Sequence, residues 1–277
     1  IEIAQGSEIL LLNNDVIVTP MWLEQMLEAL YSSEKVGAVG PVTNSAPGQE
    51  IVVTYKEEGE IPNFAIKTAE KYKNKWSQET KLIGFSLLFK KSALYEVGLL
   101  DELFTPGNYE DDDISFRLLL AGYKLLLCHN VFIHHFGSIS FGTDNRKFDD
   151  LLRENKLKFL EKWKISEAQL GVCRKDLINL MNLTQNDINI LEIGCGIGKT
   201  LLEIKNINAT ANLYAIEKNE QAAMIARNFS EVIIGDVEKI ELPYQEKFFF
   251  FFFLDDVLEC IYNYEEFIFR IFKKRCR

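Results

Sequence analysis

Residues 188–198 read Ile-Asn-Ile-Leu-Glu-Ile-Gly-Cys-Gly-Ile-Gly, an apolar run followed by three glycines at every second position. The run predicts a buried strand over residues 190–193, and the glycines predict a tight turn over residues 194–198. Glycines let the backbone approach a ligand closely, and the N-terminus of the following helix, residues 199–205, can meet the polar groups of that ligand. The stretch therefore indicates an α/β fold with a ligand site at the turn.

Strands and helices continue to alternate beyond this turn. Apolar runs predict strands over residues 213–216 and 231–234, with a helix over residues 221–227 between them. This order is typical of a parallel, doubly wound sheet. The next apolar segment, Phe248 to Phe253, is a run of six phenylalanines, which we interpret either as a buried strand or as the product of a slip in the gene.

Counting positions excludes two other glycine-rich motifs. A dinucleotide-binding G-x-G-x-x-G motif requires glycine where Lys199 stands, and a phosphate-binding loop ending at Thr200 requires glycine where Ile193 stands. The G-x-G-x-G spacing remains.

That spacing, with Glu217 ending the second strand and Gly235-Asp236 ending the third, resembles the class I S-adenosylmethionine-dependent methyltransferases. The resemblance implies S-adenosylmethionine as cofactor, with Glu217 accepting its ribose hydroxyls and Asp236 contacting its adenine. Against the methionine part it implies Glu192, Gly194, Gly196 and Gly198. The stretch Asp256-Val-Leu-Glu-Cys260 also matches a family element, although histidine is common where Cys260 stands.

Three polar features mark the first 145 residues: Asn13-Asn14-Asp15, the acidic run Glu110-Asp111-Asp112-Asp113, and the pair His134-His135. Each has an ordinary explanation, since Asn and Asp favour turns, acids favour the first turn of a helix, and histidines often end strands on the surface. Together they follow predicted strands or precede a predicted helix, which is where open α/β sheets bind ligands.

These features, in their order and spacing, resemble the inverting family-two glycosyltransferases of the GT-A fold. The matching stretches span roughly residues 1–165 and are Gly6-Ser-Glu-Ile-Leu-Leu-Leu-Asn-Asn-Asp15, Val39-Gly-Pro-Val-Thr-Asn44, Gly107-Asn-Tyr-Glu-Asp-Asp-Asp-Ile-Ser-Phe-Arg117, Leu120-Ala-Gly-Tyr123 and Ile133-His-His-Phe-Gly-Ser138. The resemblance implies transfer of a sugar from a nucleotide-diphospho-sugar donor to a glycan acceptor.

Residue roles follow from the resemblance. Asp15 lies at the position that binds Mg²⁺ or Mn²⁺ on the nucleotide diphosphate, although Asn13 replaces the first Asp of that element. Glu110-Asp111 matches the catalytic acidic pair, with Asp111 as the base. His135 aligns best with a further metal ligand, and His134 is the alternative. We expect Asp112 and Asp113 to cap the helix.

The two resemblances predict an α/β chain in three parts: an incomplete GT-A domain over residues 1–165, a helical linker over 166–187, and an incomplete Rossmann-like methyltransferase domain over 188–277. Because only eight residues precede the strand at 9–12, we expect the base-binding half of the first domain to be missing. We also expect the second domain to be cut at its C-terminal end.

Local patterns predict helix positions in the first part. Thr19 and Pro20 suit the N-cap and first position of a helix whose apolar residues recur from Leu23 to Leu30. The polar residues 43–80 predict mostly loop, with a short helix near residues 69–76.

Composition narrows the class of protein. The 277 residues are 47% hydrophobic and 26% charged, which is ordinary for a globular protein, and the net charge of −10 opposes non-specific nucleic-acid binding. Five scattered cysteines suggest neither a disulfide framework nor a zinc site. No 18-residue apolar stretch or signal peptide is visible, so we expect a cytoplasmic protein without a transmembrane segment.

Two functions from different classes remain open at this point. The first is a glycosyltransferase fused to a methyltransferase that acts on the same glycan. The second is a non-catalytic remnant that binds a cofactor or partner, because both domains look incomplete. The oligomeric state, donor sugar and methyl acceptor are not encoded in any readable pattern.

Overall fold

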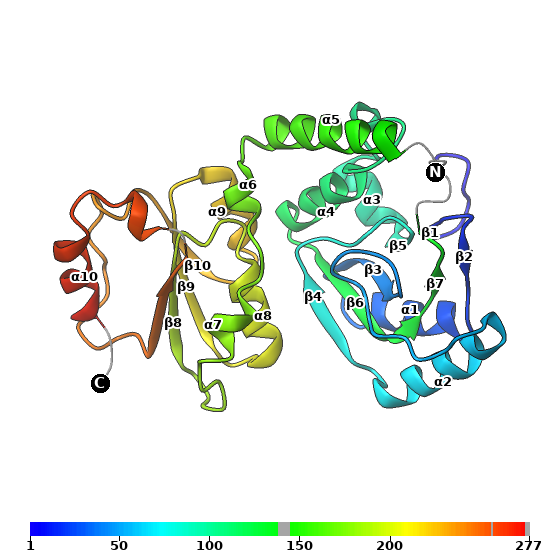
Figure 1. The fold of residues 1–277 in the computed structure, drawn as a ribbon, viewed down its shortest axis with the longest axis horizontal. Helices are drawn as coiled ribbons and strands as arrows, with labels where there is room; N and C mark the ends of the chain where they lie inside the picture. Colours follow the sequence, from blue (N-terminus) through cyan, green and yellow to red (C-terminus); the bar gives the residue numbers. More distant parts are fainter. Residues whose placement is uncertain (138–144, 256, 275–277) are drawn as a thin grey trace. The chain divides into compact units, whose positions relative to one another are not determined.

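The computed structural model describes residues 1–137, 145–255 and 257–274 (Figure 1). The chain folds into two compact units, Ile1–Phe159 and Leu160–Arg277. Each unit has its own sheet and core, and each is described by itself below.

A five-stranded mixed sheet forms the centre of the first unit. Its strand order is β1-β5-β3-β6-β4, in which β3 and β6 are parallel and the other neighbours are antiparallel. A separate antiparallel pair joins β2 to β7. The strands are β1 (Glu8–Leu12), β2 (Val16–Ile17), β3 (Val36–Val42), β4 (Trp76–Glu79), β5 (Ser86–Lys90), β6 (Lys124–Phe132) and β7 (His134–His135).

Five α-helices begin in the described part of this unit. They are α1 (Trp22–Leu30), α2 (Ile61–Lys71), α3 (Lys91–Val97), α4 (Glu110–Leu120) and α5 (Asn145–Trp163). Two short 3₁₀ turns, Glu58–Glu60 and Glu102–Phe104, accompany them. Helix α1 buries Met26 and Leu30 in a core cluster with Val39 of β3 and Leu88 of β5.

Two helix predictions for this unit are wrong. Helix α1 begins at Trp22, and Thr19 does not cap it, because its hydroxyl donates to the Phe132 carbonyl. The segment expected to be mostly loop contains helix α2, which starts eight residues before the predicted short helix and carries a proline in its first turn. Strand β4 then occupies residues for which no strand was predicted. The Ile61-Pro62 pair was an N-terminal helix signal that the polar composition concealed.

A four-stranded, wholly parallel sheet forms the second unit. Its order is β10-β9-β8-β11, so the chain starts in the middle and crosses to both sides, as the alternating pattern predicts. The strands are β8 (Asn189–Ile193), β9 (Asn212–Glu217), β10 (Glu231–Ile234) and β11 (Phe251–Leu254). The helices are α6 (Glu167–Leu170), α7 (Lys175–Ile178), α8 (Lys199–Ile207), α9 (Glu220–Ala226) and α10 (Tyr264–Phe272), with a 3₁₀ turn at Leu258–Cys260.

Both faces of this sheet are covered (Figure 1). Ile190 packs in a cluster with residues of α8 and α9, whereas its neighbour Leu191 packs in a second cluster with residues of α10. This alternation is the two-residue period of a strand buried on both faces. The last three residues of the phenylalanine run lie in β11, where Phe253 is buried. Phe249 is buried just before this strand. The second half of the run therefore forms a strand, but this strand is at the edge of the described sheet and not at its centre, and only Phe253 is buried in it.

Candidate functional site

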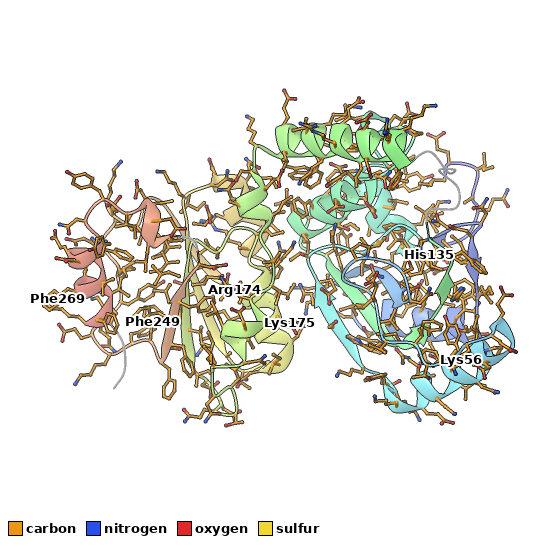
Figure 2. The ribbon with its side chains drawn as sticks, viewed as in Figure 1. Lys56, His135, Arg174, Lys175, Phe249 and Phe269 are labelled. Carbon is orange, nitrogen blue, oxygen red and sulfur yellow. The ribbon has the colours of Figure 1, made fainter. Side chains whose placement is uncertain are left out.

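In the first unit, Asp15 and His135 are brought together by the small β2–β7 ladder. Val16 of β2 pairs with His135 of β7, which is labelled in Figure 2. This pairing sets the loop residue Asp15 beside the histidine ring. The His135 Nε2 atom lies 3.5 Å from Asp15 Oδ1. Neither atom has a hydrogen-bond partner among the described residues.

The other edge of the His135 ring fixes its orientation. Nδ1 lies 2.7 Å from the Ser45 carbonyl oxygen, which can only accept, so Nδ1 carries the hydrogen and Nε2 of the neutral ring carries a lone pair. The Asn44 amide group bonds both backbone groups of His135, and the Phe85 ring stacks on the imidazole at 5.1 Å. Two acceptors, Nε2 and Oδ1, therefore face each other, an arrangement that a proton or a cation between them would stabilise.

His134 has different surroundings. Its Nδ1 atom is hydrogen-bonded to the Tyr55 hydroxyl, and its ring meets Phe136 edge to face. Partial burial lowers its pKa, while Glu58 acts in the opposite direction. Of the two histidines, His135 is the one that faces Asp15.

Asp111 lies in the first turn of α4 and is held by two backbone N–H groups. Gly84 donates to Oδ2 at 2.8 Å and Asp112 donates to Oδ1 at 2.9 Å. Burial, followed by the charges of Asp112 and Glu110, raises the pKa of Asp111 to about 7, against the opposing effect of Lys81. A carboxyl group with a pKa near neutrality is suited to take a proton from a hydroxyl.

Three consecutive residues just before β5 are held by hydrogen bonds from their backbone N–H groups. The backbone N–H groups of residues 82, 83 and 84 donate to the side chains of Ser115, Gln49 and Asp111, respectively. The next residue, Phe85, stacks on His135 and accepts a hydrogen bond from the Asn13 backbone. Gly84 and Phe85 thus connect all three polar features that the sequence singled out.

Asp112 and Asp113 do not cap α4, contrary to prediction. The N-cap position is Tyr109, in the left-handed region at φ 74°, and no side chain caps the helix. Asp112 instead pairs with Lys81 at 2.7 Å, and the fully buried Asp113 pairs with Arg117 at 2.8 Å. Two members of the acidic run, Asp112 and Asp113, are therefore in ion pairs and not in helix caps.

Asn155 of α5 is a residue that sequence reasoning missed. Its buried side-chain amide donates to the carbonyls of Phe104, Gly107 and Asn108, the loop immediately before the acidic pair. Glu110 Oε2 and Asn108 Nδ2 are buried without partners among the described residues. No sequence signal separates Asn155 from the other polar residues of its helix.

In the second unit, a cavity of about 620 Å³ lies at the carboxyl ends of the strands. It is lined by the ends of β8, β9 and β10, by the segment after β11 and by α6, including Glu192, Gly194, Gly196, Glu217, Asp236 and Asp255. The first strand and the strand that returns on its other side, β8 and β11, are adjacent here. Crevices at such a switch point are the usual ligand sites of open α/β sheets.

The glycines of the turn adopt left-handed φ values of 78°, 53° and 80°. An added Cβ would lie 2.3 Å from Val257 at Gly194 and 2.3 Å from the Gln169 carbonyl oxygen at Gly196. At Gly198 it would meet Phe229, and Gly198 does not line the cavity. The turn therefore needs glycine partly for contacts within the protein.

Two buried acids occupy the floor of this cavity. Glu217 accepts hydrogen bonds from the backbone N–H groups of Gly196 at 2.8 Å and Asn219 at 2.7 Å. Glu192 is 4% exposed, and its Oε2 atom has no partner among the described residues. Burial, and then the charge of Glu217, raises the pKa of Glu192 well above its ordinary value.

Asp236 differs from both, because it lies at the edge of the cavity. The backbone N–H of Glu238 and the ammonium group of Lys218 lower its pKa. It is therefore an ionised group at the rim.

Residues 166–187 were expected to form a linker, but they pack within the second unit. The Ile197 backbone donates to the Gln169 carbonyl at 3.0 Å, and Lys199 Nζ donates to the Gly171 carbonyl. Arg174 pairs with Asp255 beyond β11 (Figure 2). The Ser166-x-x-Gln169 capping box is a local sequence signal for the start of helix α6. The packing of α6 against the glycine-rich turn is a tertiary contact that no local pattern encodes.

This fold and cavity define an α/β domain of the Rossmann-like class. The profile of the family described as "Methyltransferase domain" matches residues 191–274. These residues contain the end of β8, the glycine-rich turn and the whole of β9, β10 and β11. The second unit is thus a domain of the methyltransferase family. No curated protein matches the chain.

Solved methyltransferase structures match the chain only with low scores. A methyltransferase from Aquifex aeolicus is 16% identical with a TM-score of 0.32, over 40% of this chain and 63% of its own. Phosphoethanolamine N-methyltransferase 2 of Haemonchus contortus is 15% identical with a TM-score of 0.32, over 38% of this chain and 26% of its own. The chain therefore spans less than two thirds of these proteins, and scores this low carry no functional argument.

None of the described helices is both long enough and hydrophobic enough to span a membrane.

Proposed function

We propose that the second unit binds S-adenosylmethionine in its cavity and uses it for methyl transfer. The observation that carries this proposal is the buried Glu192 carboxyl, whose unpartnered oxygen belongs to a cavity with Glu217 and Asp236 among its acidic lining residues. A ligand with positive charge and hydroxyl donors suits such a lining. The match to the methyltransferase family supports the same ligand.

Each acid has a suitable partner on that cofactor. Glu217 uses one lone pair of each oxygen for a backbone N–H and keeps another for a ribose hydroxyl. Asp236, at the rim, would contact the adenine. The bound cofactor supplies the methyl group, and the protein positions it. Isothermal titration with S-adenosylmethionine tests this proposal, and absence of binding would refute it.

We propose that the first unit acts in glycosyl transfer from a nucleotide-diphospho-sugar to a glycan hydroxyl. The observation that supports it is the meeting of Asp15, His135 and Asp111 around residues 84 and 85. Asp111 would take the proton of the attacking hydroxyl, because its raised pKa of about 7 makes it a competent base near neutral pH. Glu110 would bind the acceptor through its unpartnered oxygen.

Asp15 and His135 would hold Mg²⁺ or Mn²⁺. The carboxylate and imidazole donors suit these cations, and Asp15 Oδ1 and His135 Nε2 are acceptors without hydrogen-bond partners. Since no cluster of three or more such side chains occurs in the described ranges, donor phosphates or water would complete the coordination. The cation would neutralise charge on the leaving diphosphate.

The test is transfer from a panel of nucleotide sugars with and without Mn²⁺, comparing wild type with Asp111→Asn. A loss on the order of 10²- to 10⁴-fold is expected for removal of a general base. Transfer by the variant at more than about half the wild-type rate, or full transfer in excess chelator, would refute the respective assignments. We further propose one glycan as the substrate of both units, because one chain carries both, and methylation of the transfer product tests this.

A further inference from the structure

Glu192 and Glu217 are two buried carboxyl groups at the ends of adjacent parallel strands. Glu192 is in β8 and is 4% exposed, while Glu217 ends β9 and is 5% exposed. Both line the same cavity. Two carboxylates desolvated side by side repel each other, so one of them tends to keep a proton.

Hydrogen bonding decides which carboxyl keeps it. Glu217 accepts two backbone N–H groups, from Gly196 and Asn219, and such bonds stabilise a charged carboxylate. Glu192 Oε2 has no donor among the described residues. Burial raises the pKa of Glu192, and the neighbouring Glu217 raises it further. Of the two carboxyl groups, Glu192 is therefore the one that holds the proton.

We infer that Glu192 is a charge-selective residue of the cavity, which holds a proton in the ligand-free protein and releases it to solvent when a positively charged nucleoside binds. The inference rests on the proposed use of S-adenosylmethionine and adds a selection rule to it. The proton leaves the Glu192 carboxyl for the buffer, and the ligand's positive charge replaces it as partner of the carboxylate. No other bond forms or breaks.

Other titratable groups around the cavity do not account for a proton released on ligand binding. The Cys195 thiol is buried next to both acids, and its pKa is raised well above the ordinary value, so it stays protonated. Asp236 has a lowered pKa and stays ionised. The remaining charged or titratable lining groups are Glu167, Lys199, Lys218, Glu238, Asp255 and the exposed Cys260 thiol. Each of these is less buried than Glu192.

Isothermal titration in buffers of different ionisation enthalpy at one pH measures the protons released per bound ligand. Three probes separate the charges: S-adenosylmethionine has a sulfonium and an ammonium, S-adenosylhomocysteine has only the ammonium, and 5′-methylthioadenosine has neither. We expect release of up to about one proton with S-adenosylmethionine and none with 5′-methylthioadenosine. S-adenosylhomocysteine identifies the responsible cation, since release with it indicates the ammonium and no release indicates the sulfonium.

The Glu192→Gln variant keeps the shape of the protonated side chain but has no proton to release. For wild type, affinity should rise by up to about tenfold per pH unit above the ordinary range of Glu and then level off, and the variant should lose both this dependence and the proton release. Glu246 provides the control, because it is exposed and does not line the cavity, so Glu246→Gln should retain both.

The possible results are distinguishable. Binding of S-adenosylmethionine by wild type without proton release would overturn the inference while leaving the proposed cofactor in place. Equal release with 5′-methylthioadenosine, or release by Glu192→Gln, would also overturn it. If none of the three probes binds, the proposed function fails and the inference fails with it.

Discussion

The Nε2 atom of His135 faces Oδ1 of Asp15 at 3.5 Å, although the two residues are 120 positions apart in the chain. Asn44, Ser45 and Phe85 hold the histidine from its other sides. Because the ring cannot turn without breaking these contacts, the pair is an organised arrangement and not a chance approach of two surface groups.

We predict that Mn²⁺ binds at this pair and that Asp15→Asn weakens binding by at least about tenfold, since Asp15 is the charged ligand. Electron paramagnetic resonance of free Mn²⁺ measures the affinity. His135→Gln should also weaken binding, whereas His134→Gln should not, because the His134 ring contacts Tyr55. Equal affinities of the two histidine variants would show that the cation is elsewhere.

Lys81 is expected to adjust the proton affinity of Asp111. Its ammonium group pairs with Asp112 and opposes the burial that raises the pKa of Asp111 to about 7. Lys81→Met should therefore raise this pKa further, by on the order of one pH unit, and Lys81→Arg should restore it. Carbon-13 NMR of the Asp111 carboxyl, identified by its loss in Asp111→Asn, reports the titration. An unchanged midpoint in Lys81→Met would contradict the prediction.

The raised pKa of Asp111 also predicts how the stability of the folded protein depends on pH. Asp111 has an ordinary pKa of 3.8 and a folded-state pKa of about 7, so the folded protein binds its proton more tightly than the unfolded chain does. This contribution is present below about pH 4 and is lost as the pH rises towards about 7. The stability of Asp111→Asn relative to wild type should therefore increase across this window, as measured by denaturant unfolding at several pH values. A constant difference would argue against the raised pKa.

The second unit was more predictable from sequence than the first. Five strands and helices from residue 189 to residue 234 lie within two residues of prediction, because hydrophobic period and glycine position are local signals. In the first unit Thr19 looked like a helix cap, but a tertiary bond to the Phe132 carbonyl uses its hydroxyl. Local patterns cannot anticipate a partner 113 residues away.

The candidate sites show the same division. Asp15 and Asp111 were singled out by residue type and by position after a strand or at the start of a helix, and Glu192 by the resemblance to the methyltransferases. Asn155 and the α6 segment were not, because their roles depend on which loop they pack against. The pairing of Asp112 with Lys81 was equally invisible, since acids in a first helical turn also suit the helix dipole.

Gly196→Ala should disrupt the cofactor cavity. The new Cβ would lie 2.3 Å from the Gln169 carbonyl oxygen and would require a φ of +53°. We expect α6 to be displaced and S-adenosylmethionine affinity to fall by at least about tenfold, in addition to about 1 kcal/mol of strain. Gly122→Ala, in the first unit, is the control for positive-φ strain without a clash, because Gly122 has a φ of +83° and its Cβ would have no atom within 4 Å. Equal affinity in the two variants would mean that the contact with α6 does not shape the site.

Asn155→Ala should loosen the loop that carries Asn108, Tyr109 and the acidic pair. The amide donates to three carbonyls there, at 2.8, 2.8 and 3.3 Å, and no second side chain is seen to replace it among the described contacts. Leaving buried carbonyls without donors costs about 1 to 3 kcal/mol, so we expect a loss of this size in unfolding free energy of the first unit. Asn155→Asp tests the donor role specifically, because it retains the size and oxygen of the side chain but cannot donate to carbonyls when ionised. Both variants should therefore lose stability, and Asp111 should titrate differently as its loop moves.

Replacing Asn179, at the end of α7 in the second unit, with Ala is the control, and it should leave the Asp111 titration unchanged. A wild-type Asp111 titration curve in both Asn155 variants would show that α5 supports the fold without positioning the acidic pair.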